Sequence, residues 1–384
     1  MAMSKLPDRH LMRKTPDQVD FEFTLALNNA TGKFFICEDT IEACRDLIRS
    51  VWYWRVPLET QPPRLAARVL GRLALLEVNF RLASRLSQFV PLMRNPRPLV
   101  FTDPREVILY ELKGCDVVLC HDMGPITHPS LYHPMVKATY EAVFEKVRES
   151  RPLLVFVSEM TKTLFTALYG ADYPAMTVIY PALREGVASG RETPIEAAPQ
   201  RFLLTVGSVG ARKNQLRSIE AFAQSKLADE GFSYVVCGGP EPGFDGVVEA
   251  ARKVAAVILP GYVNDSELRW LYAHADGFVL VSLLEGFGLP AAEAVSLGLV
   301  PLLSRGGALH EVAGESALLV DPLNTDEIAE GMRRLAYMKQ QEKQERLTAL
   351  RASIARFSRH SAASAWRGTL EQAIAGARGG LDRP

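Results

Sequence analysis

Two glutamates, Glu285 and Glu293, lie on either side of a glycine-containing turn in the stretch LLEGFGLPAAEA at residues 283–294. Gly286 and Gly288 leave backbone N–H groups uncovered, and the N-terminus of a following helix adds partial positive charge, which together suit an anion such as a diphosphate. Two carboxylates beside an anion repel it unless each binds a neutral polyhydroxyl group. The residues therefore predict a ligand with an anionic middle and hydroxyl-rich ends, as a nucleotide-sugar has.

A strand and a helix must position these carboxylates. The apolar run DGFVLVSL (276–283) predicts the strand, and Pro290 suits the start of a helix, where its missing N–H is no loss. Because helical side chains lean toward the N-terminus of their helix, we expect Glu293 to point back toward the loop that holds Glu285. Both carboxylates should then face one crevice at the carboxyl edge of a sheet.

Short apolar runs alternate with longer amphipathic segments along most of the 384 residues, a pattern typical of βα units and parallel sheets. Such runs form two groups, which predict an α/β protein with two parallel sheets. The first-half strands are expected at 21–28, 51–56, 98–102, 115–122, 152–158 and 177–181. The second-half strands are expected at 201–209, 232–239, 255–263, 276–283, 299–305 and 316–322.

The stretch PALREGVASGRETPIEAAPQ at 181–200 combines proline, glycine and polar residues, which predicts a linker. We therefore expect an N-terminal domain at residues 1–182, a linker at 183–200 and a C-terminal domain at 201–355. Residues 356–384 predict a last helix that packs back on the N-terminal domain.

The charge balance and the cysteines exclude several classes of function. The 44 Lys and Arg residues equal the 44 Asp and Glu residues in number, so no overall field attracts nucleic acid, and we expect no such partner. The five cysteines show no CxxC pair, which favours buried thiols in a reducing compartment. Neither a signal-peptide core nor an apolar run of about 18 residues is present, and we expect a cytoplasmic protein.

One segment departs from this balance. Residues 45–97 hold ten arginines against three acidic residues, a local charge of +7. Arg64, Arg68 and Arg72 recur every fourth residue on one face of a predicted helix, with apolar residues such as Val69 beside them. Such a helix can lie on an anionic membrane, in keeping with a lipid-linked acceptor, or it can pack on the sheet of its own domain.

The turn within its surroundings, SLLEGFGLPAAEAVSLGLVPLLS, resembles the retaining glycosyltransferases of family 4, which have the GT-B fold and the signature Glu-x7-Glu. The resemblance implies that Glu285 contacts hydroxyls of the donor sugar and that Glu293 holds the ribose. It also implies that the amides of Phe287, Gly288 and Leu289 approach the sugar and the phosphates.

The stretch TVGSVGARKNQLRSIEAF (205–222), which contains Gly207, resembles the first strand, loop and helix of the family's donor domain. By this resemblance Lys213, with Arg212 as a helper, would grip the departing diphosphate. Ser208 departs from the family pattern, in which many relatives carry a second arginine there. Stabilisation of the diphosphate should therefore rest more heavily on the two basic residues that remain.

In the first half, CHDMGPITHPSLYH (120–133) resembles the family's acceptor-domain His-Asp loop, which implies that His121 projects toward the donor sugar. NNATGKFF (28–35), which contains Gly32, resembles the glycine-containing first loop. The family's chemistry implies same-face attack, in which the leaving phosphate accepts the acceptor's proton and the histidine orients the sugar. It implies no metal and no cofactor beyond the nucleotide-sugar substrate.

Taken together, these resemblances imply two Rossmann-like domains facing across a cleft and retaining transfer of a hexose to a glycan or lipid-linked glycan. The ARKN variant at 211–214 favours GDP-mannose as donor. Serine at 208 resembles a subgroup associated with bacterial polysaccharide or lipopolysaccharide synthesis, and the basic segment 45–97 would allow peripheral contact at the inner face of the plasma membrane. Two alternatives stay open. One is a nucleotide-dependent oxidoreductase, which the lack of a GxGxxG motif after a strand disfavours; the other is a non-catalytic nucleotide-sugar-binding subunit.

Overall fold

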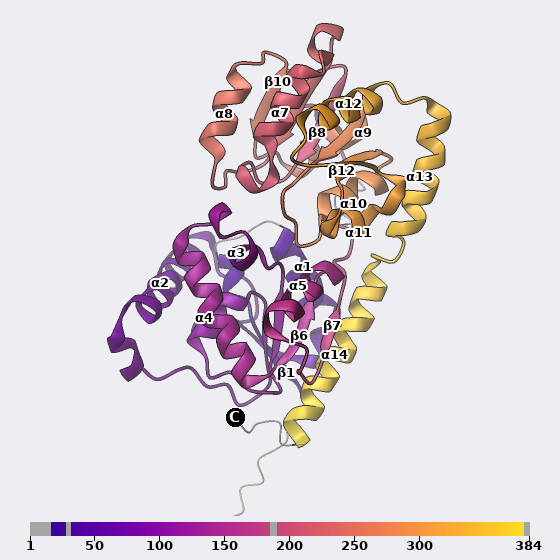
Figure 1. Ribbon diagram of the computed structural model, residues 1–384. Coiled ribbons are helices and arrows are strands. Elements are labelled where there is room, and N and C mark those ends of the chain that lie inside the picture. Colours follow the sequence, from indigo (N-terminus) through magenta and orange to yellow (C-terminus); the bar gives the residue numbers. More distant parts are fainter. Residues whose placement is uncertain (1–16, 28–31, 185–189, 380–384) are drawn as a thin grey trace, which may run out of the picture.

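The computed structural model describes residues 17–27, 32–184 and 190–379, which form two α/β halves stacked one above the other (Figure 1). Each half is built around its own sheet, and helices cover both faces of each sheet. The central strands of each sheet are buried, as expected where a parallel sheet is covered on both sides, whereas strands at the sheet edges are partly exposed.

The first sheet has seven strands in the order β3-β2-β1-β4-β5-β6-β7. Its strands are β1 (Val19–Glu22), β2 (Ile48–Tyr53), β3 (Val56–Leu58), β4 (Leu99–Phe101), β5 (Val117–Cys120), β6 (Leu153–Phe156) and β7 (Met176–Val178). The main helices of this half are α1 (Gly32–Ala43), α2 (Arg64–Ala83), α3 (Gly124–Thr127), α4 (Pro134–Ser150) and α5 (Glu159–Tyr169). Short 3-10 helices are η1 (Thr24–Leu27), η2 (Arg45–Leu47), η3 (Arg85–Phe89), η4 (Pro104–Leu109) and η5 (Pro129–Leu131).

Two predictions for the first half are wrong in detail. The strand expected at 21–28 ends at Glu22, because the Glu22 carboxylate accepts hydrogen bonds from the N–H (3.0 Å) and the hydroxyl (2.5 Å) of Thr24 and so closes a turn. The strand expected at 51–56 ends at Tyr53, and the chain then reverses through Trp54 (φ 59°) into β3, which pairs antiparallel with β2. An all-parallel sheet was expected, and this edge departs from it.

The second sheet is fully parallel, with the order β10-β9-β8-β11-β12-β13. Each of its strands overlaps one expected from the sequence: β8 (Phe202–Val206), β9 (Ser233–Cys237), β10 (Val257–Gly261), β11 (Gly277–Leu280), β12 (Pro301–Ser304) and β13 (Leu318–Val320). Its helices are α7 (Gln215–Gln224), α8 (Phe244–Arg252), α9 (Asp265–His274), α10 (Leu289–Ser296), α11 (Gly307–Ala313), α12 (Thr325–Ala336) and α13 (Gln340–Ile354), with short 3-10 helices η6 (Ala211–Lys213), η7 (Leu227–Glu230) and η8 (Gly314–Ser316). This strand order is that of a Rossmann fold, which reverses between β8 and β11.

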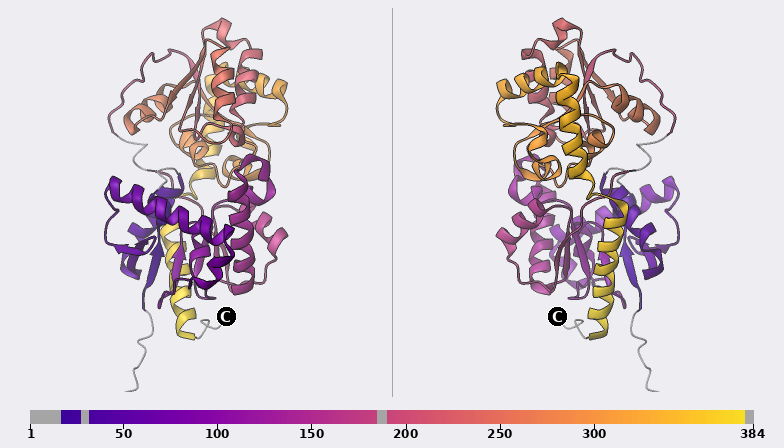
Figure 2. Two further views of the ribbon diagram at one scale, coloured as in Figure 1. Left: turned by 90° about the vertical axis from the view of Figure 1, so that its left-hand side faces the viewer. Right: turned by 90° about the vertical axis from the view of Figure 1, so that its right-hand side faces the viewer.

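The chain passes between the halves twice, once before β8 and once after α13. The last helix, α14 (Arg359–Gly379), runs back along the first half, as the right-hand panel of Figure 2 shows. Ion pairs fix it there, with Arg359 bound to Asp39 (2.6 Å) and Arg367 bound to Asp46 (2.7 Å). Among the helices that the structure describes, none is both long and apolar enough to cross a membrane.

Candidate functional site

A cleft of about 490 Å³ lies between the two halves, within the size range of small-molecule sites. Loops that follow strands of both sheets line it. All ten residues that the sequence singled out are among its lining residues: Gly32, His121, Gly207, Arg212, Lys213, Glu285, Phe287, Gly288, Leu289 and Glu293. The structure thus gathers them in one place, although their individual roles stay predictions.

The position of the cleft follows from the strand order of the second sheet. Gly207 directly follows β8, and the turn 284–288 lies between β11 and α10, so both loops leave the sheet where its strand order reverses. Ligands of open α/β sheets bind outside the carboxyl ends of the strands at this switch point. Helix α10 begins at Leu289. Pro290 has no N–H, and Ala291 and Ala292 donate theirs to the carbonyl oxygen of Gly288, so among the described contacts only the Leu289 N–H of this first turn has no backbone acceptor and can serve as a donor for an anion.

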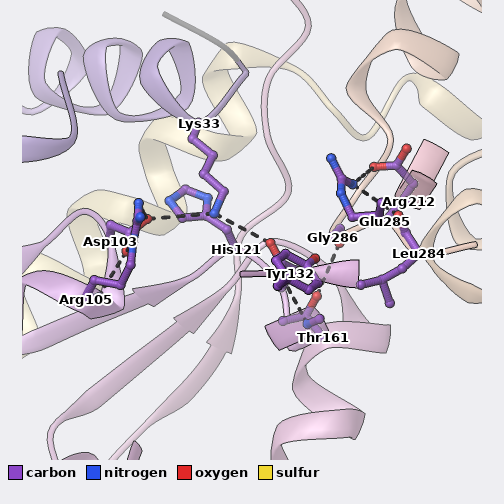
Figure 3. Close-up of polar contacts among 12 residues, drawn as sticks. Lys33, Asp103, Arg105, His121, Tyr132, Thr161, Arg212, Leu284, Glu285 and Gly286 are labelled. Carbon is purple, nitrogen blue, oxygen red and sulfur yellow. Dashed lines mark hydrogen bonds and ion pairs between the residues drawn. The ribbon is translucent and has the colours of Figure 1, made fainter. Parts of the chain in front are cut away.

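Glu285 lies at the centre of a buried charge cluster. Its Oε1 accepts hydrogen bonds from Lys213 Nζ (2.5 Å) and Ser282 Oγ (2.8 Å), and its Oε2 lies 3.4 Å from Arg212 Nη1. Arg212 also binds Glu241 at 3.0 Å. In this structure the two cations that were expected to grip a diphosphate are therefore held in place by carboxylates. Figure 3 shows Arg212 beside Glu285.

Burial and neighbouring charges shift the pKa values of these groups in opposite directions. Burial alone would raise the pKa of Glu285, but the positive charges of Lys213 and Arg212 hold that pKa below its ordinary value. Burial lowers the pKa of Lys213, against the raising effect of Glu285. Burial opposes the charge of Arg212 as well, yet Glu285 and Glu241 raise its pKa. The cluster therefore carries an ionised carboxylate, which fixes the two basic side chains side by side at the cleft.

Glu293 has a partner that the sequence analysis missed. Arg184 binds it through two hydrogen bonds, Nε to Oε1 at 2.5 Å and Nη2 to Oε2 at 2.9 Å, and Tyr272 donates its hydroxyl to Oε2 at 3.3 Å. The guanidinium of Arg184 also lies 4.9 Å from the ring of Phe35 in the first half. A carboxylate has about four acceptor positions, so three of those of Glu293 are occupied.

His121 is buried at the end of β5, and its Nε2 lies 2.7 Å from the carbonyl oxygen of Thr102. Since a carbonyl only accepts, Nε2 carries the proton, and in the neutral ring Nδ1 is the acceptor. Burial, followed by the charge of Lys33, lowers the pKa of His121 to about 4. The imidazole is therefore neutral at pH 7.

Because the ring is neutral in the folded protein, we predict that the stability of the fold depends on pH. The unfolded chain takes up a proton at His121 below about pH 6.5, whereas the folded protein does so only near pH 4, so stability falls as the pH drops from 6.5 to 4. We expect His121→Asn to lower the dependence of the unfolding free energy on pH by up to about 1.4 kcal/mol per pH unit over this range. Urea unfolding of both proteins across this range measures the difference, and an unchanged slope would show that the ring is accessible to water.

The first half contributes a second charged group that the sequence analysis did not include. Lys33, near the start of α1, lies 3.8 Å from Asp103 (Figure 3). It also lies 3.6 Å from Asp122. Asp122 caps a turn, since its Oδ1 accepts from the N–H of Gly124 at 3.0 Å, and it also lines the cleft. No motif spacing marks Lys33, since its partners are 70 or more positions away.

Gly286 joins the two halves. Its carbonyl oxygen accepts hydrogen bonds from Ser158 Oγ (2.6 Å) and Thr161 Oγ1 (3.3 Å) at the start of α5. A Cβ built at Gly286 would overlap the backbone oxygen of His121, so only glycine leaves room for this approach. Beside it, Glu311 of the second half accepts the N–H group of Glu159 at 2.8 Å. The turn is therefore held against the first half.

An aromatic cluster supports the same turn from behind. Phe287 packs edge-on against Phe357 with ring centroids 4.9 Å apart, and Phe357 in turn lies 5.2 Å from Tyr180. Tyr180 belongs to the first passage of the chain between the halves, and Phe357 to the second. The side chain of Phe287 is thus an anchor, and only its backbone remains for a ligand.

The residues that the structure describes offer no cluster of metal ligands. Within them, no three or more His, Cys, Asp or Glu side chains gather as a metal ion would require. The absence of a metal requirement stays a prediction from the family resemblance.

Comparisons with known proteins agree with this geometry. Residues 191–349 match the family described as "Glycosyl transferases group 1". The chain is 28% identical to the O-antigen chain mannosyltransferase B of Escherichia coli, over 62% of this chain and 65% of that protein. It is 26% identical to the GDP-mannose:cellobiosyl-diphosphopolyprenol alpha-mannosyltransferase of Xanthomonas campestris, over 65% of this chain and 72% of that protein. The matches thus span about two thirds of these relatives.

Solved structures show the fold. The trehalose-6-phosphate synthase OtsA superposes with a TM-score of 0.66 at 14% identity, covering 92% of this chain and 99% of that one. HepE from Anabaena, solved with UDP and glucose, superposes with a TM-score of 0.66 at 16% identity over the same shares. The predicted GT-B fold, with two Rossmann-like domains facing across a cleft, is confirmed.

Proposed function

We propose, from the match of residues 191–349 to the group 1 glycosyl transferases, that this chain transfers a hexose from a nucleotide-sugar with retention of configuration. The observation that carries the proposal is the turn between β11 and α10, which brings Glu285, Glu293 and a helix N-terminus to one switch point beside two basic side chains. A nucleotide diphosphate sugar needs such a set of partners: hydroxyl acceptors at both ends and positive charge between them.

The first chemical task is to stabilise the leaving diphosphate. Lys213 and Arg212 lie at the cleft with their positions fixed by Glu285, and Leu289, the first residue of α10, lines the same space. Groups that are already oriented cost no reorganisation when negative charge develops on the leaving group. These donors would therefore act together on the departing phosphates.

The second task concerns the sugar. Three of about four acceptor positions on Glu285 are occupied, which leaves room for one sugar hydroxyl. His121 offers Nδ1 as an acceptor, but a group with a pKa of about 4 is a weak base at neutral pH. This favours a mechanism in which His121 orients the sugar and the leaving phosphate takes the proton from the acceptor hydroxyl.

For the substrates, we propose GDP-mannose as donor and a glycan or lipid-linked glycan as acceptor. The support is that several relatives are named as mannosyltransferases of O-antigen or diphosphopolyprenol-linked glycans. A lipid-linked acceptor would place the protein at the cytoplasmic face of the plasma membrane as a peripheral protein. No nucleic-acid partner is part of the proposal.

The proposal is tested by thermal shift with UDP, GDP, ADP and their sugars, because a ligand that binds only the folded state raises the melting temperature. We expect a shift with GDP and GDP-mannose that Glu293→Ala and Lys213→Ala abolish. Release of GDP with an added acceptor then measures turnover. No shift with any nucleotide would overturn the proposal, and a shift without turnover under any acceptor would favour a non-catalytic binding subunit instead.

Arg184 provides a further prediction on the donor site. Since it occupies both oxygens of Glu293, a ribose diol must displace it or share the carboxylate. We expect Arg184→Ala to tighten nucleotide binding several-fold in isothermal titration, while the ligand-free protein melts at a lower temperature because Glu293 is left buried without its cation. Arg191→Ala, an exposed arginine of the same linker, is the control. Weaker binding by Arg184→Ala would instead make Arg184 a donor contact.

The oxidoreductase alternative gains no support from the comparisons, because the matched family and the named relatives transfer sugars. An absorbance test for reduction of a nicotinamide cofactor would exclude it directly.

A further inference from the structure

Helix α2 and the segment after it expose an unusual amount of apolar surface. Of the sixteen large hydrophobic side chains that are exposed among the described residues, ten lie between Leu65 and Leu92. Five of them, Leu65, Val69, Leu73, Leu76 and Phe80, follow one another at helical spacing along α2. Scattered exposed hydrophobics are ordinary, but a continuous patch of this kind marks an interaction site.

The patch is not the side of α2 that packs on its own domain. The helix rests on the first half through the buried small residues Gly71 and Ala74, which lie on the face opposite the exposed stripe. In Figure 1 α2 lies at the left-hand edge of the first half, and the left-hand panel of Figure 2, which turns that edge toward the viewer, shows it in front. The sequence alone left open whether this helix packs on its sheet or faces a membrane. In the structure one face packs on the domain, and the opposite, apolar face is exposed.

Arginines border this stripe. Arg64, Arg68 and Arg72 are exposed along α2, and Arg85 is exposed in η3. Within the part of the chain that the structure describes, these four have no carboxylate partner, whereas Arg55 of the same segment is paired with Glu77 at 2.6 Å. The apolar stripe and these four arginines are called the basic apolar face below.

We propose that the basic apolar face binds an anionic lipid bilayer. A helix that buries leucine and phenylalanine side chains among acyl chains while its arginines contact anionic headgroups is the arrangement of a peripheral membrane helix. Phe89 of η3, exposed by 75%, extends the apolar surface beyond the end of α2. The segment 45–97 carries a sequence charge of +7 while the whole chain is neutral. Arg94 and Arg97 of this segment are paired with Glu111 and Asp20, so the positive charge that remains available to a membrane comes mainly from the arginines of the basic apolar face.

The charge also decides between a bilayer and a second copy of this chain. In a twofold dimer the same surface of both copies would meet, which would bring one positive segment against another. Such an arrangement leaves the four arginines facing like charges. A bilayer with anionic headgroups neutralises them.

This inference deepens the proposed function. Membrane binding itself does not depend on that function; only the reason for it, access to a lipid-linked acceptor, does. None of the residues of the basic apolar face lines the cleft. Membrane attachment would therefore hold the cleft close to a lipid-linked acceptor without taking part in the chemistry.

The test is flotation of the full chain with vesicles of phosphatidylcholine alone or with about one third phosphatidylglycerol. We expect binding to the anionic vesicles only, and a loss with rising salt, because exposed charges are screened. Two variants should each lower the bound fraction at least tenfold: the triple change Leu65→Gln, Leu76→Gln and Phe89→Gln, and the triple change Arg64→Glu, Arg68→Glu and Arg72→Glu. The control variant carries Leu168→Gln, Leu216→Gln and Leu323→Gln, which are exposed leucines elsewhere, and should bind as the wild type does.

The outcomes separate this inference from the proposed function. Because the altered side chains are exposed and do not line the cleft, all three variants should keep the melting temperature and the nucleotide-induced shift. Failure of the wild type to float, or equal flotation of all variants, would overturn membrane binding while leaving the nucleotide result untouched. A concentration-dependent dimer in light scattering that the Leu65 triple variant abolishes would assign the face to a second copy and would also overturn it.

Discussion

Replacing Lys213 by methionine is expected to lower kcat by about 100- to 1000-fold, the loss seen when an oriented donor to a developing negative charge is removed. Lys213 is buried, with its side chain exposed by only 7%, and lies 2.5 Å from Glu285. It is thus a charge held out of water at the point where the leaving diphosphate would form. Steady-state kinetics with saturating donor measures the effect on kcat.

A second variant separates catalysis from folding. Lys213→Met leaves Glu285 buried without its nearest cation, which is expected to cost on the order of 3 kcal/mol, since breaking a buried ion pair strands one charge. The double variant Lys213→Met with Glu285→Gln removes both charges and should recover most of that stability. It should not recover activity. If activity returned together with stability, Lys213 would have only a structural role.

Gly286→Ala is expected to lower activity by about 100-fold, because a displacement of about 1 Å in a reacting geometry has that effect. The added Cβ would overlap the backbone oxygen of His121, and backbone atoms of a buried strand end do not give way as a flexible side chain does. The backbone of Gly286 is not in the left-handed region, so the constraint is one of space alone. The two halves should then be forced apart at the turn.

The matched control for this change is Gly239→Ala. Gly239 lines the same cleft, but a Cβ built there meets no atom within 4 Å. Small-angle scattering should show a larger radius of gyration for Gly286→Ala than for the wild type or the control. An active Gly286→Ala protein with unchanged scattering would mean that the contact between the turn and His121 is not needed.

The donor side of the site was predictable because its signal is local. The apolar run before Glu285, the glycines and the proline after it specify a strand, a turn and a helix, and the spacing of the two glutamates places them on the same edge. Each of these choices depends on neighbours a few residues away. The same holds for the six strands of the second sheet, whose apolar runs are separated by clear breaks.

Other parts of the site depend on contacts between distant residues and carry no such signal. Arg184 sits in a stretch whose composition predicts only a linker, yet it binds Glu293 109 positions later. Lys33 meets Asp103 and Asp122 because the strand order of the first sheet brings their loops together. The turn at Glu22 was missed for the opposite reason: the apolar pattern continues, but one carboxylate ends the strand.

The aromatic contact between Tyr180 and Phe357 has a mechanical consequence. These residues mark the two places where the chain crosses between the halves, and their rings lie 5.2 Å apart, so the two covalent tethers run side by side. Two domains tethered along one edge can rotate about that edge as a hinge, and points near the hinge move least. Phe287 packs against Phe357 at this hinge. The turn that holds Glu285 and the start of α10 that holds Glu293 would therefore stay almost stationary while the far side of the cleft widens. Such a motion would let an acceptor enter or a product leave while the nucleotide is still held.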